Sequence, residues 1–193
     1  MERELILTGI GGQGIQLASA VVARAAVDEN REVQVFGSYG GMMRGGPTES
    51  TVVIADRPVE TPPTVGSAWS VILMHHDHAE HALRCLRPGS LLLVNSTVVS
   101  ELRIGAGCEV VEVPASALAV EAGHIMAASM VMIGAHAALT GLVSLPSLLR
   151  ASSESLPAYR ARHAALNREA LEAGFSSVEP GSVPAWPERV TAG

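Results

Sequence analysis

The chain has 193 residues and a formal net charge of −6, a length that one folded domain accommodates. Hydrophobic residues make up 48% of the sequence but aromatic residues only 3%, so the core must be built from Ala, Val, Leu, Ile and Met. The acidic balance excludes the positive field that attracts nucleic-acid backbones, so we expect no nucleic-acid partner. No apolar run reaches the roughly 18 residues that a membrane span needs, and the N-terminal residues do not resemble a signal peptide. We therefore expect a cytoplasmic protein with no membrane partner.

Strand-like and helix-like patterns alternate from the N-terminus onward. Glu4–Thr8 is a short apolar run that ends at Gly9, and apolar residues recur at helical spacing over Gln13–Val27. The same alternation predicts strands at 33–36, 50–55, 70–74, 90–95 and 109–113, and helices at 77–86, 115–122, 125–140, 145–152 and 158–173. Strands separated by helices are typical of parallel sheets. We therefore predict a single-domain, Rossmann-like α/β fold with a mostly parallel sheet and helices on both faces.

The folded domain is expected to comprise residues 1–174. Gly174 is predicted to end the last helix, because glycine commonly follows the final residue of a helix. The remaining residues, 175–193, are rich in Pro, Ser and Gly and show no periodicity. We predict that they form an irregular tail, free to lie across a partner.

The first turn carries glycines in the arrangement G-x-G-x-x-G, at Gly9, Gly11 and Gly14. It follows a predicted strand and opens a predicted helix, which is the context that dinucleotide-binding folds require. Glycines permit a tight turn, and the free N–H groups at the start of the helix favour a phosphate. The alternative is that the glycines only allow the helix to pack closely on the sheet. Nicotinamide enzymes usually carry Asp or Glu at the end of the second strand, but this strand ends in apolar residues and Gly37, so the NAD(P) fingerprint is incomplete.

A second glycine-rich stretch spans Gly37–Pro47. It is too rich in glycine to be stabilised by burial of its own side chains, so we expect it to face a ligand or a partner. Arg44 carries a planar charge suited to phosphate or carboxylate, and Gly45 and Gly46 would let the backbone approach the same group. The alternative is that Arg44 makes an ordinary surface ion pair.

Residues 75–81 read His-His-Asp-His-Ala-Glu-His, which looks like a metal-binding cluster because His78 and His81 are neighbours on a predicted helix and His75 ends a strand. Asp77 is, however, a good helix N-cap, and the histidines are expected to be solvated at the end of a strand, so we predict no metal site here. Cys85 and Cys108 are the two cysteines of the chain. They are too few for a zinc or iron–sulfur site made of cysteines, and we expect both to be buried thiols.

Together these segments resemble the gamma subunit, or gamma domain, of the 2-oxoacid:ferredoxin oxidoreductases, the family of the pyruvate, 2-oxoglutarate and ketoisovalerate enzymes. The resemblance rests on G-x-G-G-Q-G, on R-G-G before a β-branched strand, and on three later segments. These motifs lie at Gly9–Gly14, Arg44–Gly46, Val111–Pro114, Met130–Gly134 and Asn167–Gly174. Two positions depart from the pattern: Met42 stands where members commonly carry an acidic residue, and Ser129 stands where they carry Asn.

The resemblance implies a non-catalytic gamma-type domain that packs beside the active site of a larger enzyme. That enzyme oxidatively decarboxylates a 2-oxoacid, transfers the acyl group to coenzyme A and passes two electrons to ferredoxin. The phosphates of coenzyme A are the natural ligands for the two glycine-rich segments. The residues implied in this contact are Gly9, Gly11, Gly12, Gln13, Gly14, Arg44, Gly45, Gly46 and Ser129.

The resemblance also implies partners: alpha and beta subunits, with or without a delta subunit, and ferredoxin as the electron acceptor of the complex. Thiamine diphosphate, Mg²⁺ and the iron–sulfur clusters are expected in those partner subunits, since this sequence lacks a G-D-G motif with paired Asn. The short, separate form of the chain slightly favours 2-oxoglutarate as the substrate. The alternative function is a stand-alone, nucleotide-binding Rossmann-like oxidoreductase or transferase.

Overall fold

The structure, a computed structural model, describes residues 1–39, 45–60, 62, 64–77, 79–100, 102, 107–156 and 163–186. Its centre is one six-stranded sheet in the order β2-β3-β1-β4-β5-β6. The strands are β1 Glu2–Ile10, β2 Glu32–Tyr39, β3 Pro47–Ala55, β4 Ala68–Leu73, β5 Leu86–Asn95 and β6 Glu109–Val113. Strands β1, β4, β5 and β6 run parallel, whereas β3 is antiparallel to both of its neighbours. The predicted mostly parallel α/β sheet is confirmed.

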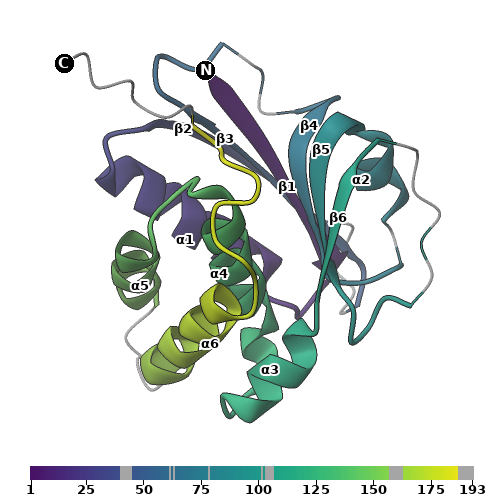
Figure 1. The fold of residues 1–193 in the computed structure, drawn as a ribbon, viewed down its shortest axis with the longest axis vertical. Coiled ribbons are helices and arrows are strands. Elements are labelled where there is room, and N and C mark those ends of the chain that lie inside the picture. The colour runs from purple at the N-terminus through teal and green to yellow at the C-terminus, as the bar shows by residue number, and fades with distance from the viewer. Residues whose placement is uncertain are drawn as a thin grey trace.

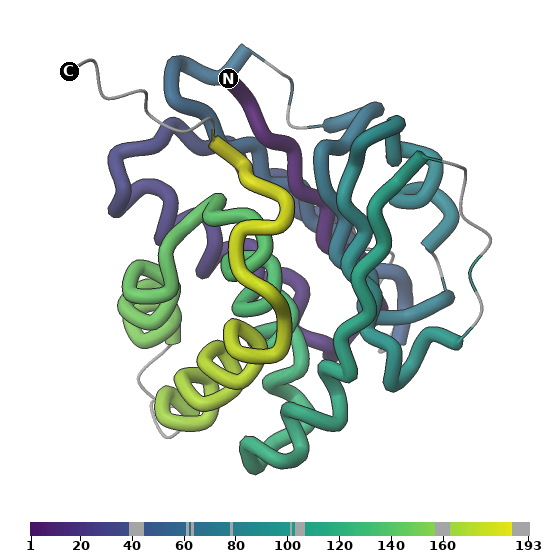
Figure 2. Tube along the Cα trace, in the orientation of Figure 1, coloured from purple at the N-terminus to yellow at the C-terminus, as the bar shows by residue number. Residues whose placement is uncertain are grey.

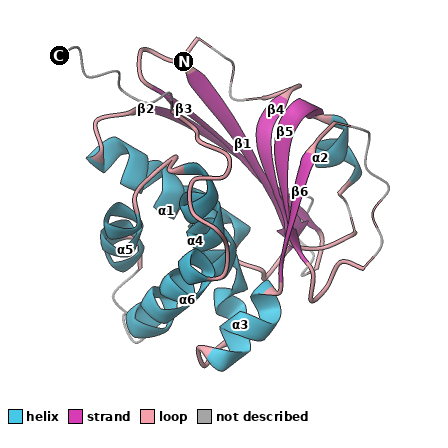
Figure 3. Cartoon of the chain, in the orientation of Figure 1, coloured by secondary structure: helices cyan, strands magenta, loops and turns pink. Residues whose placement is uncertain are grey.

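The helices cover the two faces of the sheet unequally (Figure 1). They are α1 Ile15–Asp28, α2 Glu80–Arg84, α3 Ala115–Glu121, the 3₁₀ turn η1 Ile125–Ala127, α4 Ala128–Thr140, α5 Leu145–Glu154 and α6 Ala164–Ser176. Figure 3 shows α2 alone on one face and the other helices gathered on the opposite face. All 13 residues of α4 are buried. A helix that is apolar all round must be covered on every side, and α4 accordingly lies between the sheet and α6.

The crossing of α4 and α6 depends on two glycines. A Cβ on Gly134 would overlap the carbonyl of Leu171, and a Cβ on Gly174 would overlap the carbonyl of Val131. Gly174 was predicted to end the last helix, but α6 continues through it to Ser176. The glycine is needed there because the backbones of the two helices approach too closely for any side chain.

The region before β5 differs from the prediction of a helix over 77–86. Only Glu80–Arg84 is helical, and its N-cap is Ala79 rather than Asp77. Strand β5 begins at Leu86 instead of Ser90, and its register against β4 shifts between Ala68 and Ser70. Pro88 and Gly89 therefore lie inside an irregular stretch of strand.

The described part of the tail packs back on the domain (Figure 2). Backbone N–H groups of Gly181, Val183 and Ala185 donate to the last carbonyls of α4, which a helix end otherwise leaves unpaired. Trp186 donates its indole N–H to the carbonyl of Leu142 at 3.1 Å. The guanidinium of Arg31 lies 3.9 Å from the centre of the Trp186 ring. Residues 177–186 therefore cap and cover α4, and residues 187–193 lie outside the described part of the chain.

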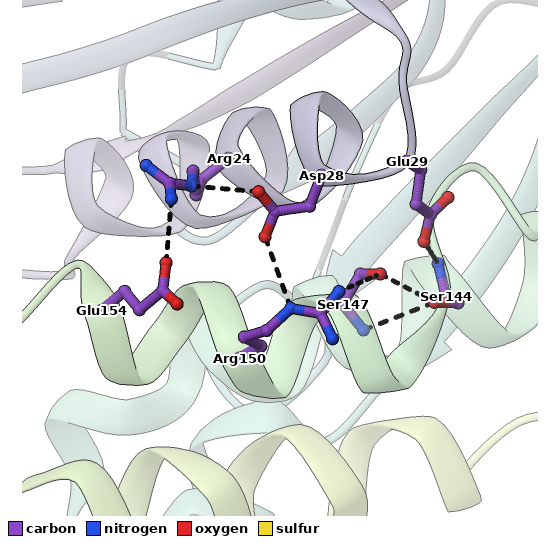
Figure 4. Close-up of polar contacts among 7 residues, drawn as sticks. All are labelled: Arg24, Asp28, Glu29, Ser144, Ser147, Arg150 and Glu154. Carbon is purple, nitrogen blue, oxygen red and sulfur yellow. Dashed lines mark hydrogen bonds and ion pairs between the residues drawn. The ribbon is translucent and has the colours of Figure 1, made fainter.

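Helices α1 and α5 are joined by a surface network of ion pairs and hydrogen bonds (Figure 4). Arg24 pairs with Asp28 at 3.1 Å and with Glu154 at 3.0 Å, and Arg150 reaches Asp28 at 3.5 Å. At the start of α5, the N–H of Ser144 donates to Glu29 at 2.8 Å. The Arg24 and Arg150 side chains are more than half exposed, so each pair contributes little to stability, but together they fix the position of α5 on α1.

One histidine is fully enclosed by the sheet and α4. The His136 ring lies edge-on to Trp69 with centroids 6.0 Å apart, and Nε2 is 3.0 Å from the Ser70 hydroxyl. Burial lowers the pKa of His136 to about 4, because the charged imidazolium would lose its hydration. His136 is therefore a neutral, hydrogen-bonded core residue.

Candidate functional site: the glycine turn and its pocket

The glycine turn links the end of β1 to the start of α1. Gly12 has φ of 103° and Gly14, the residue before α1, has φ of 77°, so both use the left-handed region that glycine tolerates. No side chain caps α1, and no acidic residue lies in its first turn. The first N–H groups of α1 and the positive end of its dipole are therefore open to an anion.

The side chain of Gln13 holds the turn in shape. Its Oε1 accepts from the N–H of Ile10 at 3.0 Å, and its Nε2 donates to the carbonyl of Met74 at 3.3 Å. A Cβ on Gly9 would overlap this amide. Gln13 and Gly9 therefore shape the turn and tie it to the end of β4, and both functional groups of the Gln13 amide are used within the domain.

The two glycine-rich segments of the sequence meet in space. The N–H of Gly11 donates to the carbonyl of Gly46 at 2.8 Å. A Cβ on Gly11 would lie 3.3 Å from the backbone nitrogen of Gly45, so only glycine allows this close approach comfortably. Gly45 itself has φ of 91° and open space where a side chain would be. Arg44 lies outside the described residues.

Ser129 joins the same location from α4. A Cβ on Gly14 would lie 2.7 Å from the Ser129 hydroxyl, so the beginning of α4 abuts the beginning of α1. Ser129 is only 2% exposed, and its hydroxyl makes no hydrogen bond with the residues that the structure describes. Its neighbour Ala127, the N-cap of α4, likewise provides no side-chain cap. Two helix N-termini without side-chain caps thus lie together beside the glycine turn.

A pocket of about 620 Å³ opens beside this turn. Its lining includes Gly12 and Gly14 of the turn, His124 and Met126 around η1, and Asn167 of α6. None of the described residues that line it is acidic, although the whole chain carries a net charge of −6. No described lining side chain would therefore repel an anionic ligand at the N-terminus of α1.

A second cleft, of about 720 Å³, lies beside α2, and Thr48 lines both this cleft and the first pocket. Its charged side chains pair with one another: His81 Nδ1 is 3.0 Å from Glu49, and Arg84 contacts Glu80 on the same helix. Burial is the main cause that raises the pKa of the nearby Cys85 thiol, which therefore stays protonated at neutral pH. The N-terminus of α2 at this cleft also lacks a side-chain cap, but Glu80 places a negative charge in its first turn, and Arg84 and His81 both have acidic partners.

The predicted absence of a metal site at residues 75–81 stays a prediction. Ligand-type atoms of His75, His76 and Asp77 lie within 4.8 Å of one another, and His78 is outside the described residues. The N–H of Asp77 donates to His75 Nδ1 at 3.1 Å, which occupies that nitrogen's lone pair. Of the two thiols, Cys85 is buried as expected, but Cys108 is half-buried.

Sequence reasoning did not include His124, His163 and Asn167 among the residues of this site. His124 caps η1 by accepting from the N–H of Met126 at 3.0 Å. Asn167 was noted only within a helical motif. The signal in the sequence was Asn167 itself, a polar residue on the same helix face as the apolar Ala170 and Leu171. A polar side chain on such a face usually needs a hydrogen-bonding partner.

These features define a Rossmann-like module with a glycine turn at an uncapped helix N-terminus, the architecture of a gamma-type subunit. The family model described as pyruvate ferredoxin/flavodoxin oxidoreductase matches residues 4–177. The chain belongs to this family, in its class of gamma subunits, and the resemblance drawn from the sequence motifs is confirmed. Among the described residues, none of the helices has both the length and the apolar character needed to cross a membrane.

Two relatives illustrate the similarity. Subunit KorC of the 2-oxoglutarate synthase of Methanocaldococcus jannaschii is 32% identical over 160 residues, which cover 81% of this chain and 85% of that protein. The solved gamma subunit of a keto/oxoacid ferredoxin oxidoreductase from Geobacter sulfurreducens is 29% identical, with a TM-score of 0.76 over 91% of this chain and 97% of that one.

A third solved structure shares the fold at lower identity. It is the 2-oxoglutarate:ferredoxin oxidoreductase of Magnetococcus marinus with 2-oxoglutarate, coenzyme A and succinyl-CoA bound. The two chains are 20% identical, with a TM-score of 0.81 over 94% of this chain. The match covers 33% of the longer protein, so the gamma-type fold is there one part of a larger chain.

Proposed function

We propose that this chain is the gamma subunit of a cytoplasmic complex that oxidises a 2-oxoacid, forms an acyl-CoA and reduces ferredoxin. Alpha and beta subunits, with or without a delta subunit, would hold thiamine diphosphate, Mg²⁺ and the iron–sulfur clusters. The residues of this chain suit that division, because two cysteines cannot provide a four-cysteine cluster site. Within the complex, this subunit supplies a surface that contacts coenzyme A.

The observation that supports the coenzyme A contact most directly is the junction of Gly11 with Gly46. It brings both glycine-rich segments to one place, beside the open N-terminus of α1 and the 620 Å³ pocket. Backbone N–H groups of this kind bind phosphates, and coenzyme A carries several. Arg44, directly before Gly45, would add a charge-assisted hydrogen bond to a phosphate. Gly9 and Gln13 would act by shaping the turn, and Ser129 by donating its hydroxyl.

For the substrate, we propose 2-oxoglutarate. Support comes from the KorC subunits of 2-oxoglutarate synthases, which are 32–34% identical to this chain. The PorC subunit of the Methanothermobacter thermautotrophicus pyruvate synthase is 26% identical over 178 residues. The alternative, a stand-alone nucleotide-binding oxidoreductase or transferase, gains no specific support from the site.

The test is reconstitution with candidate alpha and beta subunits from the same organism. The isolated chain is expected to contain no iron and no thiamine diphosphate and to oxidise no 2-oxoacid. The complex should oxidise 2-oxoglutarate faster than pyruvate. Turnover by the isolated chain with coenzyme A and a dye acceptor would contradict the subunit role, and a preference for pyruvate would contradict the choice of substrate.

The contact with coenzyme A is tested by Arg44→Ala in the complex. The KM for coenzyme A should rise roughly 10- to 150-fold, and the KM for the 2-oxoacid should change little, because one charge-assisted hydrogen bond is lost. Arg57→Ala, after the opposite end of β3, is the control and should leave both constants unchanged. An unchanged KM for coenzyme A in a normally assembled Arg44→Ala complex would assign Arg44 to a surface ion pair.

A further inference from the structure

The two edges of the sheet differ in how well they are protected against a further strand. Among the described residues, β2 and β6 are the outermost strands (Figure 3). The edge of a sheet offers unpaired backbone N–H and C=O groups, and native proteins usually blunt it with charged residues, proline, bulges or short length. β6 has two of these devices, because it is only 5 residues long and carries the exposed Glu109 and Glu112.

β2 has none of these devices over residues 33–39. This stretch reads Val-Gln-Val-Phe-Gly-Ser-Tyr, without a charged residue or a proline, in a chain with a net charge of −6. Its pairing with β3 runs from Glu32 to Tyr39 in one unbroken register, so no bulge bends the edge away. Val35 is 47% exposed and Phe36 is 44% exposed, on opposite faces of the strand because side chains alternate. β2 is therefore a long, uncharged and partly apolar edge.

One side-chain contact shows which backbone groups of β2 face the open edge. The carbonyl of Phe36 points toward β3, where it accepts from the Ser50 hydroxyl at 3.4 Å. In an antiparallel ladder, the backbone groups of successive residues point alternately to the two sides. The N–H and C=O groups of Val35 and Gly37 therefore point away from β3 and are available to a further strand.

We propose that β2 pairs with β2 of a second copy of this chain, antiparallel about a two-fold axis at Phe36. This register places Phe36 opposite its own copy, and Val35 opposite Gly37 of the second copy. The outward N–H and C=O groups of Val35 and Gly37 then meet in mutual hydrogen-bonded pairs. Glu32 stays outside the paired stretch, so no like charges face each other. Two six-stranded sheets become one continuous sheet in a closed two-fold dimer.

A second copy is the occupant that the charges of the edge favour. A charged partner strand would find no opposite charge over residues 33–39 and would lose hydration without compensation, whereas an identical strand has no charge to bury. Phe36 also lines the 720 Å³ cleft, so the clefts of the two copies adjoin at the axis. A single pair of strands is a small interface, and the dimer is accordingly weak. This pairing goes beyond the proposed function, since it joins two gamma subunits and, through them, two complexes.

The first test is sedimentation velocity of the full-length chain over a dilution series. The wild type should dimerise with a midpoint in roughly the micromolar range. Phe36→Glu and Phe36→Arg should each raise the dissociation constant at least about 10-fold, because like charges then lie directly opposite. An equimolar mixture of the two variants should form the dimer again, because opposite charges then meet at the axis.

The matched control for these variants is Val110→Glu on the other edge, at a residue that is 42% exposed. It should leave the dimer intact. Thermal unfolding shows whether each variant is folded, and the melting temperature should change little at a half-exposed position. A wild-type chain that stays monomeric at every concentration would overturn the proposal, and so would a mixture of Phe36→Glu and Phe36→Arg that stays dissociated.

Cross-linking tests the register without a disruptive substitution. Phe36 and its copy form a non-hydrogen-bonded pair, whose Cα atoms lie about 4.5 Å apart, within the roughly 4.4–6.8 Å that a disulfide spans. In a Cys108→Ser background, Phe36→Cys should therefore form a disulfide-linked dimer on mild oxidation. Val35→Cys is the matched control, because its copies are diagonal neighbours about 7–8 Å apart and should cross-link far more slowly. Equal cross-linking of the two variants, or none for Phe36→Cys, would show that β2 does not pair in this way.

Discussion

Replacing His136 by Gln should flatten the acid side of the protein's stability curve. Above pH 6.5 the imidazole is neutral in the folded and the unfolded chain, so it adds no pH dependence. Below that pH the unfolded chain binds a proton at the ordinary pKa of 6.5, whereas burial keeps the folded imidazole neutral down to a pKa of about 4. The free energy of unfolding therefore falls as the pH decreases from 6.5 to about 4.

The size of this effect follows from the difference of about 2.5 in pKa. At 1.36 kcal/mol for each pH unit, His136 removes about 3 kcal/mol in total, of which about 2 kcal/mol is lost between pH 7 and pH 5. Gln does not titrate and can still bond to the Ser70 hydroxyl, so the variant should lose this dependence. Other titrating groups act equally in both proteins and cancel in the difference.

Urea unfolding at pH 7, 6 and 5 measures the prediction directly. Subtracting the free energy of unfolding of His136→Gln from that of the wild type should give a difference that changes by about 2 kcal/mol between pH 7 and pH 5. His81→Gln is the matched control, since the His81 side chain is 57% exposed and its removal should change the slope far less. Parallel slopes for the wild type and His136→Gln, or an NMR titration of His136 near pH 6.5, would refute the reasoning.

Three further substitutions test the packing and the turn. Gly174→Ala should destabilise the protein by roughly 1–3 kcal/mol in urea unfolding, because its Cβ would overlap the carbonyl of Val131. The control is Gly66→Ala, whose Cβ would meet open space and which should change stability by less than about 0.5 kcal/mol. Trp186→Ala should lower stability by about 2 kcal/mol, because it removes the hydrogen bond to Leu142 and the contact with Arg31. It should also expose residues 177–186 to limited proteolysis, and unchanged protease resistance would contradict the packing of the tail. Gly12→Val should introduce roughly 1–3 kcal/mol of backbone strain at a φ of 103° and weaken coenzyme A binding by the complex. A normal melting temperature together with a normal affinity for coenzyme A would mean that the turn has been misinterpreted.

Much of the fold was predictable because its signals are local. The run Glu4–Thr8, the glycines behind it and the helical spacing up to Val27 all act over a few residues, and β1, the turn and α1 formed where these patterns placed them. Gly141 was predicted to stop a helix, and it ends α4 with φ of 58°. The glycine motifs also pointed to the two segments that meet beside the pocket, since few other sequences can form such turns.

Features that depend on distant segments could not be predicted in the same way. Whether Gly174 ends a helix or lies inside one is decided by Val131, and whether residues 177–186 pack is decided by the carbonyls at the end of α4. The antiparallel direction of β3 likewise depends on its pairing with β1.

The sequence by itself determined the class of fold, the family and the position of the glycine turn, because each follows from periodicity or from residues a few positions apart. Only the tertiary structure decided that Gly11 bonds to Gly46, that Ser129 abuts Gly14 and that Asn167 lines the pocket beside them. A hydrogen-bonding group has or lacks a partner according to which elements surround it, and those elements come together only when the chain is folded.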